Sequence, residues 1–243
     1  MAGEIVIVTG GAKGVGRYIA HTFAKEGAKV ALADVDVERM ERTAAELRAL
    51  GADGLAVPTD VRNEDAVRAM VDRVASEYGR IDVLVNDAGI VPHFAWGVPR
   101  WPRIRDMELG FWSRVMETNL GGTFLCTKHV LPRMEAQRSG HVVNLYGGGA
   151  PTSSGGACVY VVSKEAIRVF TQYVAEEARE ANVCVVAVNP GAAIATEDAP
   201  EEARQRMPGP EFVENRFVLA ARAGMDLSGK LLTLQDGRLV VEE

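Results

Sequence analysis

The sequence contains few of the residues that build metal and redox sites. Among its 243 residues there are three cysteines and four histidines. Their spacing fits neither a metal-binding cluster nor a dithiol pair. They are Cys126, Cys158 and Cys184, and His21, His93, His129 and His141. We therefore expect cysteines that act as small apolar core residues, and no metal site.

Long apolar runs and an excess of positive charge are also absent. No apolar run approaches the roughly 20 residues that span a bilayer. The first residues, MAGEIVIVTGG, lack the basic segment and long apolar stretch of a signal peptide. The net charge of −6 argues against nucleic acid or an anionic membrane as the main partner. Together these absences predict a cytoplasmic protein.

Short β-rich runs alternate with amphipathic helical stretches along the whole chain. Most of the runs are continuously apolar, which is typical of strands buried on both faces of a parallel sheet. This alternation, with right-handed crossovers, predicts an α/β fold with a doubly wound sheet. We find no linker or repeat and expect one domain over residues 1–243. The expected strands are residues 5–9, 29–33, 54–57, 83–86, 141–145, 183–188 and 230–234.

The first expected strand leads directly into a glycine-rich turn that is followed by a helical stretch. Glycines allow a sharp turn and leave room for a pyrophosphate to approach the backbone. The start of the helix then offers free N–H groups and the positive end of its dipole to the phosphates. Between a first strand and a first helix, this pattern predicts a dinucleotide site. The spacing is T-G-x-x-x-G-x-G, made by Thr9, Gly10, Gly14 and Gly16, with Val15 inside it.

An acidic residue, Asp34, ends the second expected strand. A carboxylate about 20 residues past the glycines accepts hydrogen bonds from the adenosine ribose and repels a 2′-phosphate. Asp34 therefore predicts NAD rather than NADP. Lys13, inside the turn, is a weaker signal for NADP because a cation there can reach a phosphate. Asp36, two residues later, could cap the next helix rather than contact the cofactor.

Two further segments follow expected strands at the same edge of the sheet. Asp60 and Val61 follow the third strand, where a carboxylate and a backbone amide could contact the adenine. Alternatively, Asp60 caps the next helix, a role that Asn63 can also fill. The small residues after the fourth strand would let the sheet edge approach the cofactor. They belong to the sequence NDAG, with Asn86, Ala88 and Gly89.

Taken in order, these motifs resemble those of the short-chain dehydrogenases/reductases, and the resemblance covers essentially the whole chain. It also rests on Asn119 in ETNLGGTF, on Tyr160-x-x-x-Lys164 and on Asn189-Pro190-Gly191. The resemblance implies a Rossmann-type sheet of seven parallel strands and a nicotinamide cofactor. It implies hydride transfer between that cofactor and a secondary alcohol or ketone. It further implies a homodimer or homotetramer built on long helices near residues 107–134 and 158–179.

Tyr160 and Lys164 lie four residues apart, on one face of an expected helix. The resemblance implies that Tyr160 is the general acid/base, that Lys164 modulates it and holds the nicotinamide ribose, and that Asn119 binds a proton-relaying water. A free phenol has a pKa of ~10, too high for a base near neutrality. The charge of Lys164, with that of oxidised nicotinamide, is expected to lower the pKa of Tyr160.

One residue that the resemblance implies is missing. The family usually places a serine 13 residues before the tyrosine, where this sequence has Gly147. Removing such a preorganised donor typically costs on the order of 10²–10³ in rate. Tyr146 is a poor substitute because the strand pleat would point it to the opposite face. Three explanations stay open: a hydroxyl from Thr152, Ser153 or Ser154; a contact from substrate or water; or a changed function, as a dinucleotide-binding sensor, a lyase or an isomerase.

The segment after the sixth expected strand is assigned to cofactor and substrate. The resemblance implies that Pro190, Gly191 and Thr196 contact the cofactor, although Thr196 stands one residue later than the family's threonine and needs a bulge. Residues 191–215 are charged and interrupted by prolines, which predicts a lid. Residues 90–106, with three prolines, two tryptophans and three arginines, are expected to form a long loop near the substrate.

Overall fold

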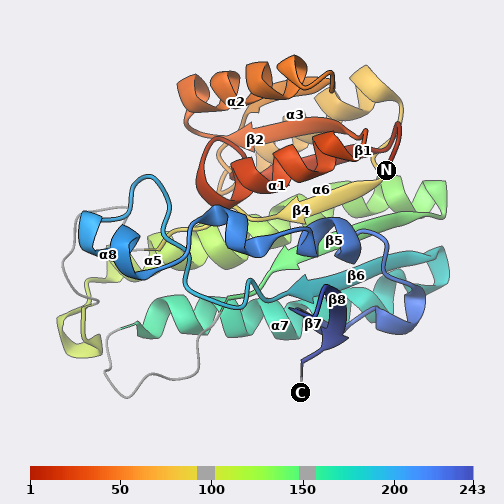
Figure 1. Cartoon of the computed structure of the whole chain (residues 1–243). Helices are drawn as coiled ribbons and strands as arrows, with labels where there is room; N and C mark the ends of the chain where they lie inside the picture. The colour runs from red at the N-terminus through yellow and green to blue at the C-terminus, as the bar shows by residue number, and fades with distance from the viewer. Residues whose placement is uncertain (92–101, 148–156, 243) are drawn as a thin grey trace.

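The computed structural model describes residues 1–91, 102–147 and 157–242. Its centre is an eight-stranded sheet in the order β3-β2-β1-β4-β5-β6-β7-β8 (Figure 1). Strands β1 to β7 run parallel to one another, and β8 is antiparallel to β7. The strands are β1 (Ile5–Thr9), β2 (Lys29–Asp34), β3 (Gly54–Pro58), β4 (Val83–Asn86), β5 (Gly140–Leu145), β6 (Val183–Val188), β7 (Leu231–Gln235) and β8 (Arg238–Val241).

The α/β doubly wound sheet is confirmed, and each of the seven predicted strands is found within one residue at either end. The seven parallel strands are all present, and a short hairpin adds an eighth, antiparallel strand, β8, at the edge. The hairpin turn is Asp236-Gly237, with φ values of 50° and 73°. Positive φ at both central residues is what a two-residue turn of the right twist requires.

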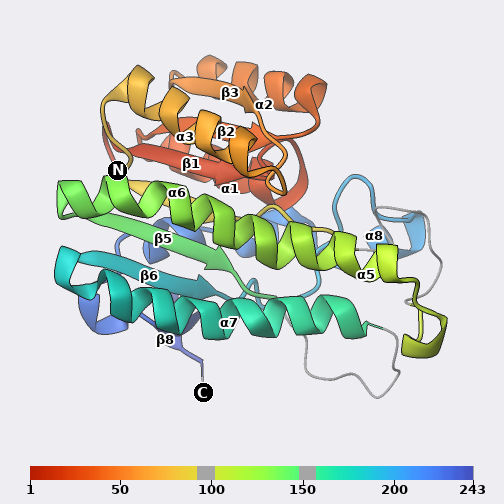
Figure 2. The ribbon, with the colours of Figure 1, turned by 180° about the vertical axis from the view of Figure 1, so that it is seen from behind.

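Helices cover both faces of the sheet, and two buried apolar clusters fill the layers between them. Helices on the face seen in Figure 1 are α1 (Gly14–Lys25), α2 (Val37–Ala49) and α9 (Arg216–Ala220). On the opposite face, seen in Figure 2, lie α3 (Glu64–Tyr78), α6 (Gly122–Gln137) and α7 (Cys158–Ala178). Strands between two helical layers have no solvent face, which explains their continuous apolar sequences.

The remaining elements are short and lie mostly between β4 and α6 and between β6 and β7. They are η1 (Ile104–Asp106), α5 (Leu109–Met116), the π-helical η2 (Glu117–Gly121), η3 (Arg179–Ala181), α8 (Glu201–Arg206), η4 (Pro210–Val213) and η5 (Met225–Leu227). Of the predicted loop at 90–106, residues 92–101 lie outside the described part of the chain. Among the helices that the structure describes, none is long and apolar enough to cross a bilayer.

Side-chain caps settle two alternatives that the sequence left open. The Asp36 carboxylate accepts a hydrogen bond from the Arg39 amide and caps α2. Asn63 caps α3 by accepting from the Ala66 amide, so Asp60 is not needed for that role. Both helices therefore begin just beyond the carboxyl ends of the strands that precede them.

The predicted site residues lie at or beyond the carboxyl ends of β1 to β6, and these ends form one edge of the sheet. The strand order reverses between β1 and β4, where chain connections leave in opposite directions. In open α/β sheets, ligands bind at such a switch point. We therefore look for the functional site between the loops that follow β1 and β4.

Candidate active site

The glycine-rich turn after β1 is packed so closely that its glycines are required. Gly10 has a φ of +71°, and a Cβ built on it would lie 2.9 Å from Ala88 Cα. A Cβ on Gly16 would collide with the Gly10 carbonyl oxygen. The turn delivers the start of α1, with its free amides, to the edge of the sheet. It has the form that a phosphate-binding turn needs.

Thr9 joins this turn to the loop after β4. Its hydroxyl accepts hydrogen bonds from the Asp87 and Ala88 amides, each at 3.1 Å, and donates to the Val85 carbonyl at 3.3 Å. Thr9 is itself buried. The structure therefore gives Thr9 a role in aligning two loops, and the family spacing alone did not reveal it.

Asp34 also has partners within the protein. Its two carboxylate oxygens accept hydrogen bonds from the Ala12 and Asp36 amides, each at 3.0 Å. Asp34 thus fixes the glycine-rich turn against the end of β2. Each oxygen keeps a further lone pair, so the carboxylate can still accept from a hydroxyl.

Asp60 and Val61 lie farther along the same edge. Asp60 forms an ion pair with Arg62 at 2.6 Å, and the hydrogen bond from Arg62 lowers the pKa of Asp60. The Val61 side chain packs against α6, because a Cβ on Gly122 would lie 2.6 Å from Val61 Cγ2. Arg62 is a charged neighbour of this end of the site that the sequence reading did not identify.

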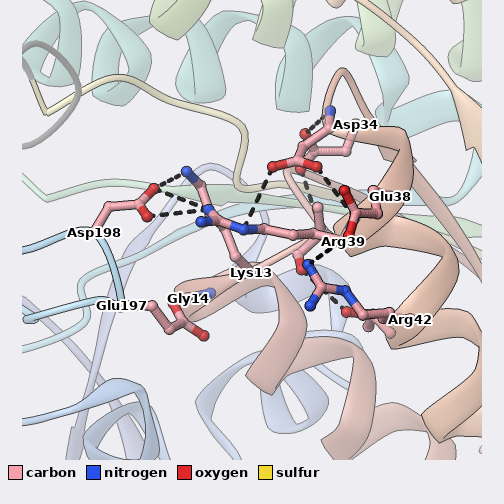
Figure 3. A network of polar contacts seen from close by, with 11 residues as sticks. Lys13, Gly14, Asp34, Glu38, Arg39, Arg42, Glu197 and Asp198 are labelled. Atoms are coloured by element: carbon pink, nitrogen blue, oxygen red, sulfur yellow. Dashed lines mark hydrogen bonds and ion pairs between the residues drawn. The ribbon is translucent and has the colours of Figure 1, made fainter.

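An acidic segment from beyond β6 lies on the glycine-rich turn (Figure 3). The Glu197 carboxylate accepts a hydrogen bond from the Gly14 amide at 2.9 Å. The Asp198 carboxylate forms ion pairs with Lys13 and, at 3.0 Å, with Arg39. Contacts over a sequence separation of this size leave no local signal, so the sequence did not predict them.

Tyr160 and Lys164 lie one turn apart on α7, as predicted. Lys164 is 3% exposed, and its ammonium group lies 5.8 Å from the centre of the Tyr160 ring. Its Nζ donates a hydrogen bond to the Leu145 carbonyl at 3.1 Å. This bond fixes the lysine at the carboxyl end of β5, beside the tyrosine.

Asn119 lies in the π-helical segment η2 and is completely buried. Its side-chain oxygen accepts from the Ile90 amide at 2.7 Å, and its Nδ2 donates to Ser163 Oγ at 3.1 Å. Single π-helical turns often mark functional positions. Here the wider turn presents Asn119 both to the loop after β4 and to the residue before Lys164.

Gly147 faces the Tyr160 hydroxyl. A Cβ built on Gly147 would lie 3.5 Å from Tyr160 Oη and 3.6 Å from Pro190 Cγ. Tyr146 turns away, as predicted, and its hydroxyl donates to Glu165 Oε1 at 2.5 Å. The candidate replacements Thr152, Ser153 and Ser154 lie outside the described residues.

Asp87 adds a half-buried carboxylate that the sequence did not single out. It accepts a hydrogen bond from the Gly16 amide, and burial raises its pKa while the charge of Lys164 opposes that shift. Burial and, to a smaller extent, the charge of Asp87 raise the pKa of Tyr160. Burial lowers the pKa of Lys164. In the chain alone, burial and Asp87 therefore raise the pKa of Tyr160, and the predicted fall, which depends also on the charge of oxidised nicotinamide, stays a prediction.

The Asn86 side chain lies inside the fold. Its Nδ2 donates to Thr127 Oγ1 at 3.1 Å and to Asn144 Oδ1 at 2.8 Å, and Asn144 in turn donates to Thr171 Oγ1 at 2.9 Å. Both amide hydrogens of Asn86 are used in this network. Asn86 therefore joins β4 to β5 and α6, although the sequence assigned it to the cofactor.

The loop after β6 brings Gly191 and Thr196 to the site by different routes. Gly191, with a φ of +84°, lies over the buried Arg216, whose Nη2 would be 3.3 Å from a Cβ at that glycine. Thr196 lies against the turn, since a Cβ on Gly14 would be 2.8 Å from Thr196 Cγ2. Burial lowers the pKa of Arg216. No motif surrounds Arg216, so the sequence gave no reason to select it.

The sequence matches the short chain dehydrogenase family over residues 4–206. The chain belongs to this family. Short-chain dehydrogenases bind a nicotinamide dinucleotide and are oxidoreductases, and the glycine-rich turn described above fits such a group: its glycines leave the space, and the Gly14 amide already holds a carboxylate.

Individual short-chain dehydrogenases support this assignment. The chain is 34% identical over 252 residues to the cis-4-hydroxycyclohexanecarboxylate dehydrogenase of Sinomonas cyclohexanicum, covering 99% of this chain and 98% of that protein. It is 34% identical over 204 residues to the 3-oxoacyl-[acyl-carrier-protein] reductase FabG of Staphylococcus aureus, covering 83% and 80%. The actinorhodin polyketide ketoreductase crystallised with NADPH superposes with a TM-score of 0.85 at 27% identity, covering 98% of each chain.

Proposed function

We propose that the protein is an NAD(H)-dependent oxidoreductase that interconverts a secondary alcohol and a ketone. The observation that carries this proposal is the position of the Tyr160 hydroxyl beside Gly147 and Pro190, one helical turn from the buried Lys164. We assign Tyr160 as the general acid/base, Lys164 as its electrostatic partner and Asn119 as part of the proton path.

The bound dinucleotide supplies the hydride acceptor or donor at its nicotinamide ring. For alcohol oxidation, the Tyr160 phenolate accepts the hydroxyl proton as the hydride leaves the carbon; for ketone reduction, the phenol returns a proton to the carbonyl oxygen. Lys164 favours the phenolate through its charge. Asn119 orients this end of α7 through Ser163. The cofactor would be held by residues at the same edge of the sheet. The phosphates would contact Gly10, Gly14, Val15 and Gly16, and the adenosine ribose would contact Asp34. The adenine would contact Asp60 and Val61, and the nicotinamide end would contact Ala88, Gly89, Pro190, Gly191 and Thr196.

The test is hydride transfer, followed at 340 nm, with a panel of secondary alcohols and NAD and of ketones and NADH. We expect turnover on at least one small-molecule substrate. A protein that binds NADH and turns over no member of a broad panel would favour the second candidate. That candidate is a dinucleotide-binding homologue with impaired redox activity or with lyase, isomerase or sensor activity, and Gly147 is the observation that favours it.

Asp34 gives a prediction about the cofactor. We expect NADH to bind at least about tenfold more tightly than NADPH, because Asp34 repels a 2′-phosphate. Asp34→Asn should reduce this ratio to within a few-fold, since Lys13 and Arg39 stand nearby (Figure 3). The measurement is the dissociation constant of each dinucleotide by fluorescence.

The ratio is the informative quantity, because Asp34→Asn also disturbs a hydrogen bond to Ala12 or Asp36 and weakens both dinucleotides alike. Glu38→Gln, an exposed neighbour on α2 paired with Arg42, is the matched control. Tighter binding of NADPH by the unmodified protein would contradict the NAD assignment.

Asp87 gives a prediction about pH. Asp87→Asn removes a negative charge that raises the pKa of Tyr160, so the phenolate forms at lower pH. Alcohol oxidation needs the phenolate, and its rise in rate with pH should move to lower pH by about one unit. The amide oxygen of asparagine can still accept from Gly16.

Asp65→Asn, which removes a surface carboxylate on α3, is the control and should leave the pH profile of the rate unchanged. If Asp87→Asn also leaves the pH profile unchanged, Asp87 does not influence the proton transfer.

We also propose a homodimer or homotetramer in which α6 and α7 form the subunit contact. The support is apolar exposure on these helices: Phe124 is 46% exposed, Val169 42% and Tyr173 70%. We retain the single domain over residues 1–243, the lid near 191–215 and the cytoplasmic location as parts of the same proposal.

A further inference from the structure

The glycine-rich turn holds an anion that belongs to the protein itself. The Gly14 amide, at the start of α1, donates to Glu197 Oε2 at 2.9 Å. Arg17, one turn into α1, lies 3.9 Å from the other Glu197 oxygen. Because free amides and the helix dipole favour negative charge at this position, Glu197 satisfies the group that a phosphate would otherwise satisfy.

The neighbouring carboxylate, Asp198, is also held by charged and polar partners. Asp198 pairs with Lys13 of the turn and accepts from Arg39 Nη1 at 3.0 and 3.2 Å. The hydrogen bond from Lys13 is the largest cause of a lowered pKa for Asp198, and Arg39 adds to it. Figure 3 shows that Glu197 and Asp198 reach the turn from one side, while Asp34 lies on the other.

The segment packs directly onto the glycine-rich turn at Gly14. Thr196 Cγ2 would lie 2.8 Å from a Cβ on Gly14, so the segment is in direct contact with the turn. A dinucleotide whose pyrophosphate bonds to the Gly14 amide must therefore displace Glu197, and the adjacent Asp198 is carried away with it.

We propose that Glu197 and Asp198 form an internal anion that occupies the phosphate site of the glycine-rich turn and competes with the dinucleotide. This inference rests on the proposed function, since it takes the turn to be the cofactor site. The apparent affinity is then the intrinsic affinity reduced by the fraction of molecules in which the segment has left the turn. The pair therefore lowers the affinity for the cofactor.

The experiment measures binding of ADP-ribose, which lacks the nicotinamide and is independent of Tyr160, to the full chain by calorimetry. Glu197→Gln and Asp198→Asn should each tighten ADP-ribose about tenfold, since a charge-assisted contact of the closed segment is weakened. Binding of the 2′-phosphorylated form should tighten by the same factor. Circular dichroism establishes that each variant is folded.

Glu202→Gln is the matched control. It removes one carboxylate from α8 in the same segment, where Glu202 is exposed, and should leave affinity unchanged. If the unmodified chain binds ADP-ribose and neither Glu197→Gln nor Asp198→Asn tightens it, the competition is overturned while the cofactor site stands. Tightening of the 2′-phosphorylated form alone would overturn displacement, because Asp198 would then remain in the complex. If no variant binds either ligand, the inference and the proposed function fail together.

Discussion

Tyr160→Phe is expected to lower the rate of hydride transfer by a factor of about 10²–10⁴, the usual contribution of a positioned general acid/base. The hydroxyl is the group that exchanges a proton with the substrate, and the ring that remains still fills its place on α7. Dinucleotide binding should therefore be unchanged. The measurements are kcat on the best substrate of the panel and the dissociation constant of NADH for the same preparation.

Tyr146→Phe is the matched control for this loss. Tyr146 is buried and carries a hydroxyl near the end of β5, but that hydroxyl donates to Glu165 rather than facing Gly147. Its removal should leave kcat within a few-fold. If Tyr160→Phe retains most of the activity, Tyr160 is not the acid/base and the assignment of the site is wrong.

Gly147→Ser is expected to raise kcat, by a factor on the order of 10². We propose that Gly147 occupies the position of the family's usual serine, and the new side chain has room. Its Cβ would lie 3.5 Å from Tyr160 Oη and 3.6 Å from Pro190 Cγ, which are ordinary van der Waals distances. A hydroxyl on that Cβ can donate to the reacting oxygen and stabilise its developing charge. The measurement is kcat at saturating substrate.

Gly147→Ala separates the hydroxyl from the Cβ that carries it. Alanine introduces the same contacts with Tyr160 and Pro190 without a donor, so it should not raise kcat. An unchanged kcat in Gly147→Ser would mean that the contact is already supplied, by substrate, by water or by another residue of the chain. An equal rise in both variants would assign the gain to packing.

Local patterns were sufficient to predict most of the fold. β6 is continuously apolar, and β1 is apolar up to its last residue, Thr9. A glycine follows β1 at once and an asparagine follows β6, so these ends are visible in the sequence. The eighth strand was missed because β8 is short and half-exposed at the edge, so it lacks the apolar run of a central strand. Its turn, Asp236-Gly237, carried the signal, since this dipeptide favours a hairpin.

The site was predicted less completely, for reasons of distance and burial. The glycine-rich turn, Tyr160 and Lys164 are local motifs and were recognisable. The contact of Glu197 with Gly14 joins segments 183 positions apart, and no spacing rule reaches that far. The rise in the pKa of Tyr160 in the chain alone was not foreseen, because the sequence shows the nearby Lys164 but shows neither the burial of the phenol nor the charge of Asp87 acting on it.

The buried side-chain amides of Asn86 and Asn144 help to align the carboxyl ends of β4 and β5, beside the candidate active site. The two residues are direct partners and form the last pair of the β4–β5 ladder, beside the loops that follow both strands. Sliding one strand past the other would separate these amides and leave polar groups unpaired in an apolar layer, at about 1–3 kcal/mol each. The hydrogen bond between Asn86 and Asn144 therefore stabilises the observed register of β4 against β5. This bond, inside the core, thereby sets how the loops after β4 and β5 lie relative to each other.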